Sequence, residues 1–339
     1  MLKFLKKIAL FLSFPLFIIL FMDTSLRMQN SLFKEKYEGA KESQDSIEIV
    51  ILGTSRATYG VNPEAFDLYA YNLANLGQSL YFDKRITLSL LPEMNNLKYA
   101  FISIDYHSLA FSSQHNGDFW SYYGNGIKYK DTDYTWANIS PTLFGYTPKV
   151  AYAMIKNRFV NLWKHGSDIV DFEVHPSVDI YQPAVKGFVA LEGRDSLNFN
   201  HEAYIVSSKW YTEVIDESDE KKEIVEDLED FIEILLAEEV TPILFSPPTY
   251  IEYNSYLNQS HIEYNIQTSE HIAKKYGIKF WDFHDSKIFS IDDFHDMEHL
   301  NTKGALKFSN MLNDSIKKMH FMTTKGSSIL AAREDLQMK

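Results

Sequence analysis

The chain has 339 residues, with 33 Lys and Arg against 46 Asp and Glu, which gives a formal net charge of −13 at pH 7. It contains no cysteine, so disulfides, cysteine nucleophiles and thiolate metal sites are excluded. So acidic a chain also argues against nucleic acid as a partner, because phosphate binding depends on clustered Lys and Arg. With 45% hydrophobic residues, the chain is expected to fold around a sizeable core.

The first 27 residues predict a membrane anchor. Three lysines within the first seven residues precede an uncharged apolar run, residues 8–22, which ends at Asp23. The run is short for a span of about 20 residues, but apolar residues flank it and lysine stems can snorkel. No small-residue cleavage site follows, so an uncleaved anchor over residues 1–27 is favoured over a removed signal peptide or a buried core helix. The positive-inside rule then predicts a single-pass protein of the cell membrane, with a cytoplasmic N-terminus and an extracytoplasmic body.

Three further divisions of the chain are predicted from its composition and patterning. Residues 28–46 are polar and charged, as expected for a linker between anchor and body. The body is predicted to occupy residues 47–320. Residues 321–339 lack a strong pattern and are predicted to form a peripheral tail.

Within the body, short apolar runs alternate with amphipathic stretches, which predicts an α/β fold with a doubly wound parallel sheet. Strands are expected at residues 47–52, 69–73, 99–104, 241–245 and 278–283. Helices are expected near residues 82–91, 217–239, 261–276 and 302–319. The second of these helices is acidic, and its carboxylates are expected to face solvent.

Residues 105–216 do not keep this alternation and are predicted to be a large insertion. The insertion is rich in aromatic residues, whose faces suit either stacking on sugar rings or packing of the insertion itself. Among these aromatic residues are Phe119, Trp120, Tyr122, Tyr123, Tyr129, Tyr134 and Trp136.

A serine follows the first predicted strand in the sequence Gly53-Thr54-Ser55-Arg56. This position lies at the carboxyl edge of the sheet, where open α/β folds bind their ligands. Ser55 is therefore a candidate nucleophile. A helix N-cap is the alternative role for a serine at this place.

Asp296 and His299 lie three residues apart in the loop before the last predicted helix. A carboxylate at this spacing can orient an imidazole and leave its other ring nitrogen free to accept a serine proton. Because a serine hydroxyl is a poor nucleophile at its ordinary pKa, such a base would make Ser55 reactive. The sequence therefore predicts a triad in the order Ser55, Asp296, His299.

Three segments resemble blocks I, II and V of the GDSL/SGNH hydrolase superfamily: Gly53-x-Ser55, Asn75-Leu76-Gly77-Gln78-Ser79 and Asp296-x-x-His299-Leu300-Asn301-x-x-Gly304. The resemblance covers about residues 47–104 and 217–318 and implies a three-layer, flavodoxin-like fold. It also implies that Ser55 is the nucleophile, His299 the general base and Asp296 its partner. The resemblance further implies that two backbone N–H groups, those of Ser55 and Gly77, donate hydrogen bonds to the oxyanion. Acyl transfer needs such fixed donors where the oxyanion forms.

The chain departs from the family in its third block, where an asparagine side chain normally supplies another oxyanion donor. The matching strand here ends Ser103-Ile104-Asp105-Tyr106-His107. Loss of one such donor typically lowers the rate by about two to three orders of magnitude. In its anchor and its divergent third block the chain is similar to membrane-anchored relatives, such as the D-alanyl transfer protein of teichoic-acid synthesis and the alginate O-acetylation proteins.

Other polar residues near these motifs allow two further interpretations. Arg56 and Asp105 are candidates for substrate contact, with a surface salt bridge as the alternative for Arg56. A metal site is the less favoured interpretation of the acidic and histidine-rich segment, because this segment precedes a helix rather than lying on it. We therefore expect no metal and no cofactor. The residues of that segment are His284, Asp292, Asp293, His295, Asp296, Glu298 and His299.

The resemblance implies serine-dependent transfer of an acyl group, acetyl being the first candidate, or ester hydrolysis, on a cell-envelope polysaccharide. The expected partners are that polymer, an acyl donor, the membrane and a membrane-bound acyltransferase. The alternative is a non-catalytic subunit that keeps this fold for binding or assembly in a polysaccharide export or modification complex.

Overall fold

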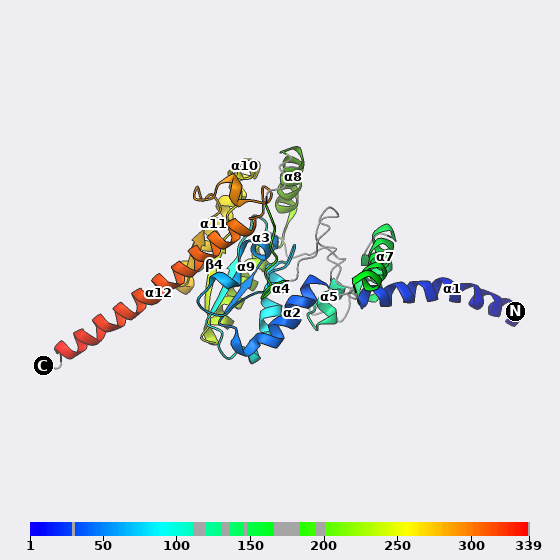
Figure 1. Cartoon of the computed structure of the whole chain (residues 1–339), viewed down its shortest axis with the longest axis horizontal. Helices are drawn as coiled ribbons and strands as arrows, with labels where there is room; N and C mark the ends of the chain where they lie inside the picture. The colour runs from blue at the N-terminus through cyan, green and yellow to red at the C-terminus, as the bar shows by residue number, and fades with distance from the viewer. Residues whose placement is uncertain are drawn as a thin grey trace.

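The computed structural model describes residues 1–28, 31–110, 119–130, 136–145, 148–165, 184–193 and 201–337 (Figure 1). Its centre is a five-stranded sheet in the order β2-β1-β3-β4-β5, and every pair of neighbours is parallel. The α/β class and the parallel sheet are confirmed, with strand ends at most two residues from the predicted ones. The strands are β1 Ile49–Leu52, β2 Ala70–Asn72, β3 Tyr99–Ser103, β4 Thr241–Ser246 and β5 Lys279–Asp282.

The strand order reverses between two neighbouring strands, β1 and β3. The chain runs outward from β1 to β2 on one side and from β3 through β4 to β5 on the other, so the order reverses between β1 and β3. Ligands of open α/β sheets bind at such a reversal. Ser55 follows β1 and Asp105 follows β3, so the third-block position and the candidate nucleophile lie at the same point.

Alternating side chains of β1 pack into two separate cores. Val50 and Leu52 join one buried cluster, whereas Ile49 and Ile51 join the other, as a period of two residues requires. Helices cover both faces, which makes three layers. α2 Leu32–Ser43, α4 Leu80–Leu90, α9 Lys221–Ala237 and α11 Gln259–Tyr276 contribute to the first cluster, and α3 Ser55–Gly60 and α12 Thr302–Gln337 to the second.

The prediction of a linker over residues 28–46 is wrong for its central part. Residues 32–43 form α2, which begins at the capping residue Ser31. Phe33, Tyr37 and Ala40 recur on one face of this helix and are buried in the first core cluster. The apolar stripe was overlooked because charged residues surround it. α2 therefore belongs to the folded body.

The last helix also runs past its predicted end. α12 continues from Thr302 to Gln337 and projects from the body toward the C-terminus (Figure 1). The stretch after Met319 contains no proline, and residues such as Ala331 and Ala332 favour helix. The peripheral tail predicted over residues 321–339 is thus helical as far as it is described.

Parts of the insertion over residues 105–216 lie outside the described residues. The described parts contain α5 Phe119–Gly124, α6 Trp136–Ile139, the π-helical turn η4 Pro141–Gly145, α7 Pro148–His165 and α8 His201–Glu217. The ring of Tyr122 is buried, with its centroid 4.2 Å from that of Phe33 and 4.3 Å from that of Phe82. This aromatic residue therefore packs the insertion onto the core. Tyr134 and the side chains of Phe119 and Trp120 lie outside the described residues.

The N-terminal run forms a single helix, α1 Leu2–Arg27. Its residues 6–27 are long and apolar enough to cross a membrane, and little of this stretch is buried against the rest of the chain. The predicted apolar N-terminal helix is therefore present.

Candidate functional site

The turn that contains the candidate nucleophile Ser55 joins β1 to α3 and is called the nucleophile turn below. Gly53 has a φ of +133°, and a Cβ there would overlap the side chain of Ser103, so the turn requires glycine. Thr54 is the N-cap of α3, because its Oγ1 accepts a hydrogen bond from the Arg56 N–H at 3.3 Å. The N-cap alternative for Ser55 is therefore wrong: the capping role belongs to its neighbour.

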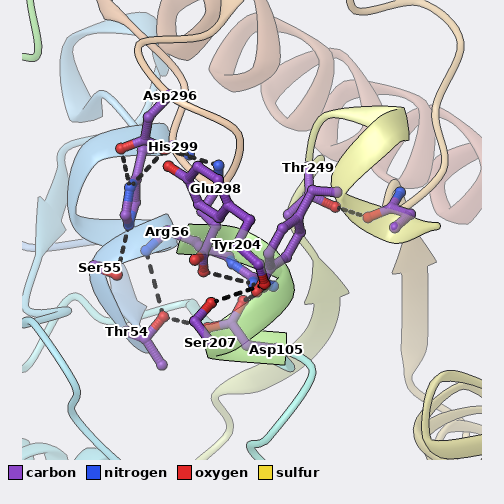
Figure 2. A network of polar contacts seen from close by, with 12 residues as sticks. Thr54, Ser55, Arg56, Asp105, Tyr204, Ser207, Thr249, Asp296, Glu298 and His299 are labelled. Atoms are coloured by element: carbon purple, nitrogen blue, oxygen red, sulfur yellow. Dashed lines mark hydrogen bonds and ion pairs between the residues drawn. The ribbon is translucent and has the colours of Figure 1, made fainter. Parts of the chain in front are cut away.

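The loop before α12 presents Asp296 and His299 to that hydroxyl (Figure 2). Asp296 Oδ1 accepts the backbone N–H groups of Glu298 and His299, at 2.7 and 2.8 Å. Asp296 Oδ2 lies 2.9 Å from His299 Nδ1, and His299 Nε2 lies 2.8 Å from Ser55 Oγ. The structure thus brings together the three residues that the sequence selected, although 241 positions separate Ser55 from Asp296 (296 − 55).

The electrostatics of the pair favour a charged carboxylate beside a strongly basic imidazole. Burial opposes ionisation of Asp296, but the neighbouring His299 and the hydrogen bonds to the carboxylate outweigh it and hold the pKa of Asp296 below its ordinary value. Burial also disfavours a charged His299, yet the charge and hydrogen bond of Asp296 prevail and raise the pKa of His299 above 6.5. This is the electrostatic arrangement that a general base needs.

These shifts predict the pH dependence of any reaction that uses this base. His299 must be neutral to accept a proton, so kcat/KM should rise with pH through an apparent pKa above 6.5. Asp296→Asn removes the charge that stabilises the imidazolium, so the midpoint should move to lower pH while the plateau falls by as much as about 10⁴-fold. Profiles of kcat/KM against pH for both proteins check this, and an unmoved midpoint would contradict the role given to Asp296.

Arg56 lies in a buried ion-pair network rather than at the surface. Its guanidinium lies 3.0 Å from Glu298 and 3.9 Å from Asp105, and 3.5 Å from the hydroxyl of Tyr253. The Asp105 side chain is 0% exposed and also accepts a hydrogen bond from Thr54 Oγ1. Asp105 has no exposed surface with which to contact a substrate, so its predicted contact role is wrong. The surface salt bridge considered for Arg56 is likewise replaced by a buried one.

Two backbone groups are candidates for the oxyanion donors. The Ser55 N–H lies in the first turn of α3, where helix N–H groups have no partner within the helix. Gly77 has a φ of +62° and lies in the loop after β2, which is joined to the nucleophile turn by a 3.0 Å hydrogen bond from the Asn75 N–H to the Gly53 carbonyl. The third-block position holds Asp105, whose carboxyl group contacts Thr54 Oγ1 and Arg56.

Asp83, which the sequence analysis did not select, connects these two loops. Its Oδ1 accepts the Gly53 N–H at 3.1 Å and the side-chain amide of Gln78 at 2.7 Å. Burial raises the pKa of Asp83 to about 8, although both hydrogen bonds act in the opposite direction, and the nearby Asp105 adds to the rise. The available signal was a carboxylate within the apolar stretch Leu80–Leu90, where a charge is expensive to bury. Asp83 fixes the spacing between the nucleophile turn and the loop that contains Gly77.

This shift predicts that the folded state weakens as pH rises. Between pH 3.8 and about 8 the unfolded chain has released the Asp83 proton while the folded chain retains it, so this contribution to stability is lost across that range. Asp83→Asn preserves the shape and an acceptor but does not titrate, so its free energy of unfolding should decline less over the same interval. Urea unfolding of both proteins from pH 5 to 8 measures this. The exposed Asp45→Asn is the matched control, and equal slopes for all three proteins would contradict it.

The residues of the metal alternative have other partners. Asp293 binds Lys303 and Lys307 at 3.3 and 2.8 Å, and it completes a capping box with Ser290. His295 Nδ1 lies 3.3 Å from the backbone carbonyl of Gly193. Within the part of the chain that the structure describes, no three His, Asp or Glu side chains are grouped so as to hold a metal ion.

Comparison with known proteins adds nothing to this geometry. No family model matches the chain, and no curated protein matches it significantly.

Proposed function

We propose that the protein is a membrane-anchored serine acyltransferase or esterase of the SGNH type, with Ser55 as nucleophile. The observation that supports this most strongly is the continuous hydrogen-bonded series from Asp296 through His299 to Ser55, with links of 2.9 and 2.8 Å. Its place at the carboxyl edge of a parallel sheet, where the strand order reverses, adds to the support.

In the first half of the proposed reaction, Ser55 Oγ attacks the carbonyl carbon of an ester while its proton passes to His299 Nε2. The Ser55 and Gly77 N–H groups donate to the oxyanion that forms. The intermediate then expels the alcohol, which takes the proton from His299, and an acyl ester remains on Ser55. In the second half a sugar hydroxyl or water attacks this ester, gives its proton to His299, and Ser55 leaves with that proton.

The anchor and the altered third block support transfer to a cell-envelope polysaccharide over simple hydrolysis. α1 would hold the site beside the membrane, with the N-terminus in the cytoplasm and the body outside. The expected partners are the polymer, an acyl donor such as an acetyl ester, and a membrane-bound acyltransferase that supplies it. Without the third donor, hydrolysis of model esters is expected to be slow.

The experiment is a burst assay on the full chain in detergent or lipid discs. p-Nitrophenyl acetate, an activated ester, should release the first equivalent of nitrophenol faster than later ones, and mass spectrometry of the quenched protein should find acetyl on the peptide that contains Ser55. Asp45→Asn, a change at an exposed residue outside the site, is the matched control and should behave as the wild type. If neither burst nor label appears in any variant, the catalytic proposal is wrong and the binding or assembly subunit becomes the better account.

A further inference from the structure

One described segment of the insertion is attached to the end of α1. Within residues 136–165 the structure describes α6, η4 and α7, and these elements are called the collar below. Asp23 of α1 accepts hydrogen bonds from the Ser140 hydroxyl and the Thr142 N–H, both at 3.0 Å. Arg27 donates to the Ile139 carbonyl at 3.1 Å. Polar contacts thus fix the collar at the point where the apolar run of α1 ends.

Apolar contacts strengthen this attachment. Leu26 of α1 is fully buried with Ala151 and Met154 of α7 in a small separate cluster. The rings of Phe21 and Phe159 are stacked, with centroids 6.3 Å apart. α7 lies beside the end of α1 that is nearer the body (Figure 1). If α1 crosses a bilayer, α7 therefore lies at the level where α1 leaves it.

The described side chains of the collar expose many large apolar groups for a surface in contact with water. Trp163 is 86% exposed and Tyr152 is 66% exposed, and a solvated surface rarely gathers so many large apolar side chains. Trp and Tyr are also the residues enriched where a membrane meets water. The exposed large apolar side chains of the collar are Trp136, Ile139, Leu143, Phe144, Tyr152, Phe159, Leu162 and Trp163.

The charge of the collar differs in sign from that of the whole chain. Residues 136–165 contain three Lys and one Arg and no Asp or Glu, in a protein with a net charge of −13. Lys149 and Lys156 are exposed beside the apolar residues of α7. Basic residues flanking an exposed apolar face are the pattern of helices that lie in the interface of an anionic membrane.

We propose that residues 136–165 form an interfacial collar, which inserts its Trp, Tyr and Leu side chains into the headgroup layer of an anionic bilayer around the end of α1. This inference extends the proposed membrane anchoring, and it is independent of acyl transfer. The collar makes the contact with lipid broader than a single helix, and so sets the tilt of the body as well as its attachment.

The absence of cysteine provides a direct test, because any introduced thiol is unique. Single nitroxide labels are placed on the full chain in lipid discs that contain phosphatidylglycerol. The collar positions are Leu143→Cys and Trp163→Cys, α1 is represented by Leu16→Cys, and the exposed body residues Ile288→Cys and Leu306→Cys are controls. Power-saturation measurements compare collisions with oxygen, which enriches in lipid, and with a water-soluble nickel complex.

Labels at positions 16, 143 and 163 are expected to collide more with oxygen, and those at 288 and 306 more with nickel. If the label at 16 collides more with oxygen, a lipid reading, but those at 143 and 163 collide more with nickel, an aqueous reading, the collar proposal is wrong and the anchor stands. That result would indicate a protein partner for this surface. Aqueous readings at all three positions overturn the anchor and the collar together. Neither outcome bears on the triad, because the measurement contains no acyl chemistry.

A second measurement tests the charge. Lys149→Glu with Lys156→Glu should shift the label at 163 toward the aqueous reading, whereas Lys222→Glu, at an exposed residue on α9, should not. Identical readings in all three proteins contradict the electrostatic part of the proposal.

Discussion

Replacing Ser55 by alanine is expected to lower kcat/KM for acyl transfer by about four to six orders of magnitude and to abolish the nitrophenol burst. The hydroxyl is the only group that the proposed reaction uses to form the acyl intermediate, and His299 Nε2 lies 2.8 Å from it. The partly exposed Ser55 makes no core contact, so the variant should fold as the wild type does. Stopped-flow kinetics with p-nitrophenyl acetate, alongside circular dichroism, measures both quantities.

The double variant sharpens this test. His299→Ala should be nearly as slow as Ser55→Ala, and the combination of both should be no slower than either, because a triad acts as a unit. If the two losses multiply instead, the residues act independently and the proposed proton transfer between them is wrong.

Replacing Arg56 by leucine is expected to destabilise the fold by about 3–5 kcal/mol, since it leaves buried charge without its partner. The guanidinium side chain is 5% exposed and pairs with Glu298 at 3.0 Å and with Asp105 at 3.9 Å. Both partners belong to segments that shape the site, so activity should fall together with stability. Urea denaturation followed by tryptophan fluorescence measures the change in the free energy of unfolding.

Two controls separate charge from packing in this prediction. Arg56→Lys keeps the charge but not the planar fork, and should recover only part of the loss. Glu298→Gln should cost less than Arg56→Leu, because Glu298 is the more exposed partner and Arg56 retains Asp105. A leucine variant as stable as the wild type would show that the network contributes no net stability, as some buried ion pairs do.

The sheet and the triad were predictable because their signals are local. Short apolar runs mark buried parallel strands, and the spacing of Asp296 and His299 within one loop already allows their side chains to meet. Ser55 was selected by its place after the first strand together with the Asp296–His299 pair and the resemblance of the surrounding motifs. The network of Arg56 could not be read in this way, because Glu298 and Tyr253 approach it from sequence distances of 242 and 197 residues. Only the folded chain brings those charges together.

The errors at the two ends of the body have a common cause. α2 is rich in Lys and Glu, and the far half of α12 mixes Thr, Ser and charged residues with scattered apolar ones. Both compositions are shared by surface helices and by linkers. α2 differs from a linker in its narrow apolar stripe of Phe33, Tyr37 and Ala40. This stripe indicates a packed helix only when the core that it contacts is known. Asp83 was missed for a related reason, since its hydrogen bonds to Gly53 and Gln78 exist only after both loops have folded.

Under the proposed function, the packing of α2 limits how far the site can move from the membrane to meet its substrate. A flexible polar tether over residues 28–46 would let the body range tens of ångströms from the bilayer, at about 3.3 Å for each extended residue. α2 is instead held in the core by Phe33 and Tyr37, and α5 contacts both α1 and α2, so the body has little freedom of its own. If the protein is anchored and transfers acyl groups as proposed, donor and acceptor must therefore come to a site at nearly constant height. Encounters with a membrane-bound donor then become a search in two dimensions rather than three.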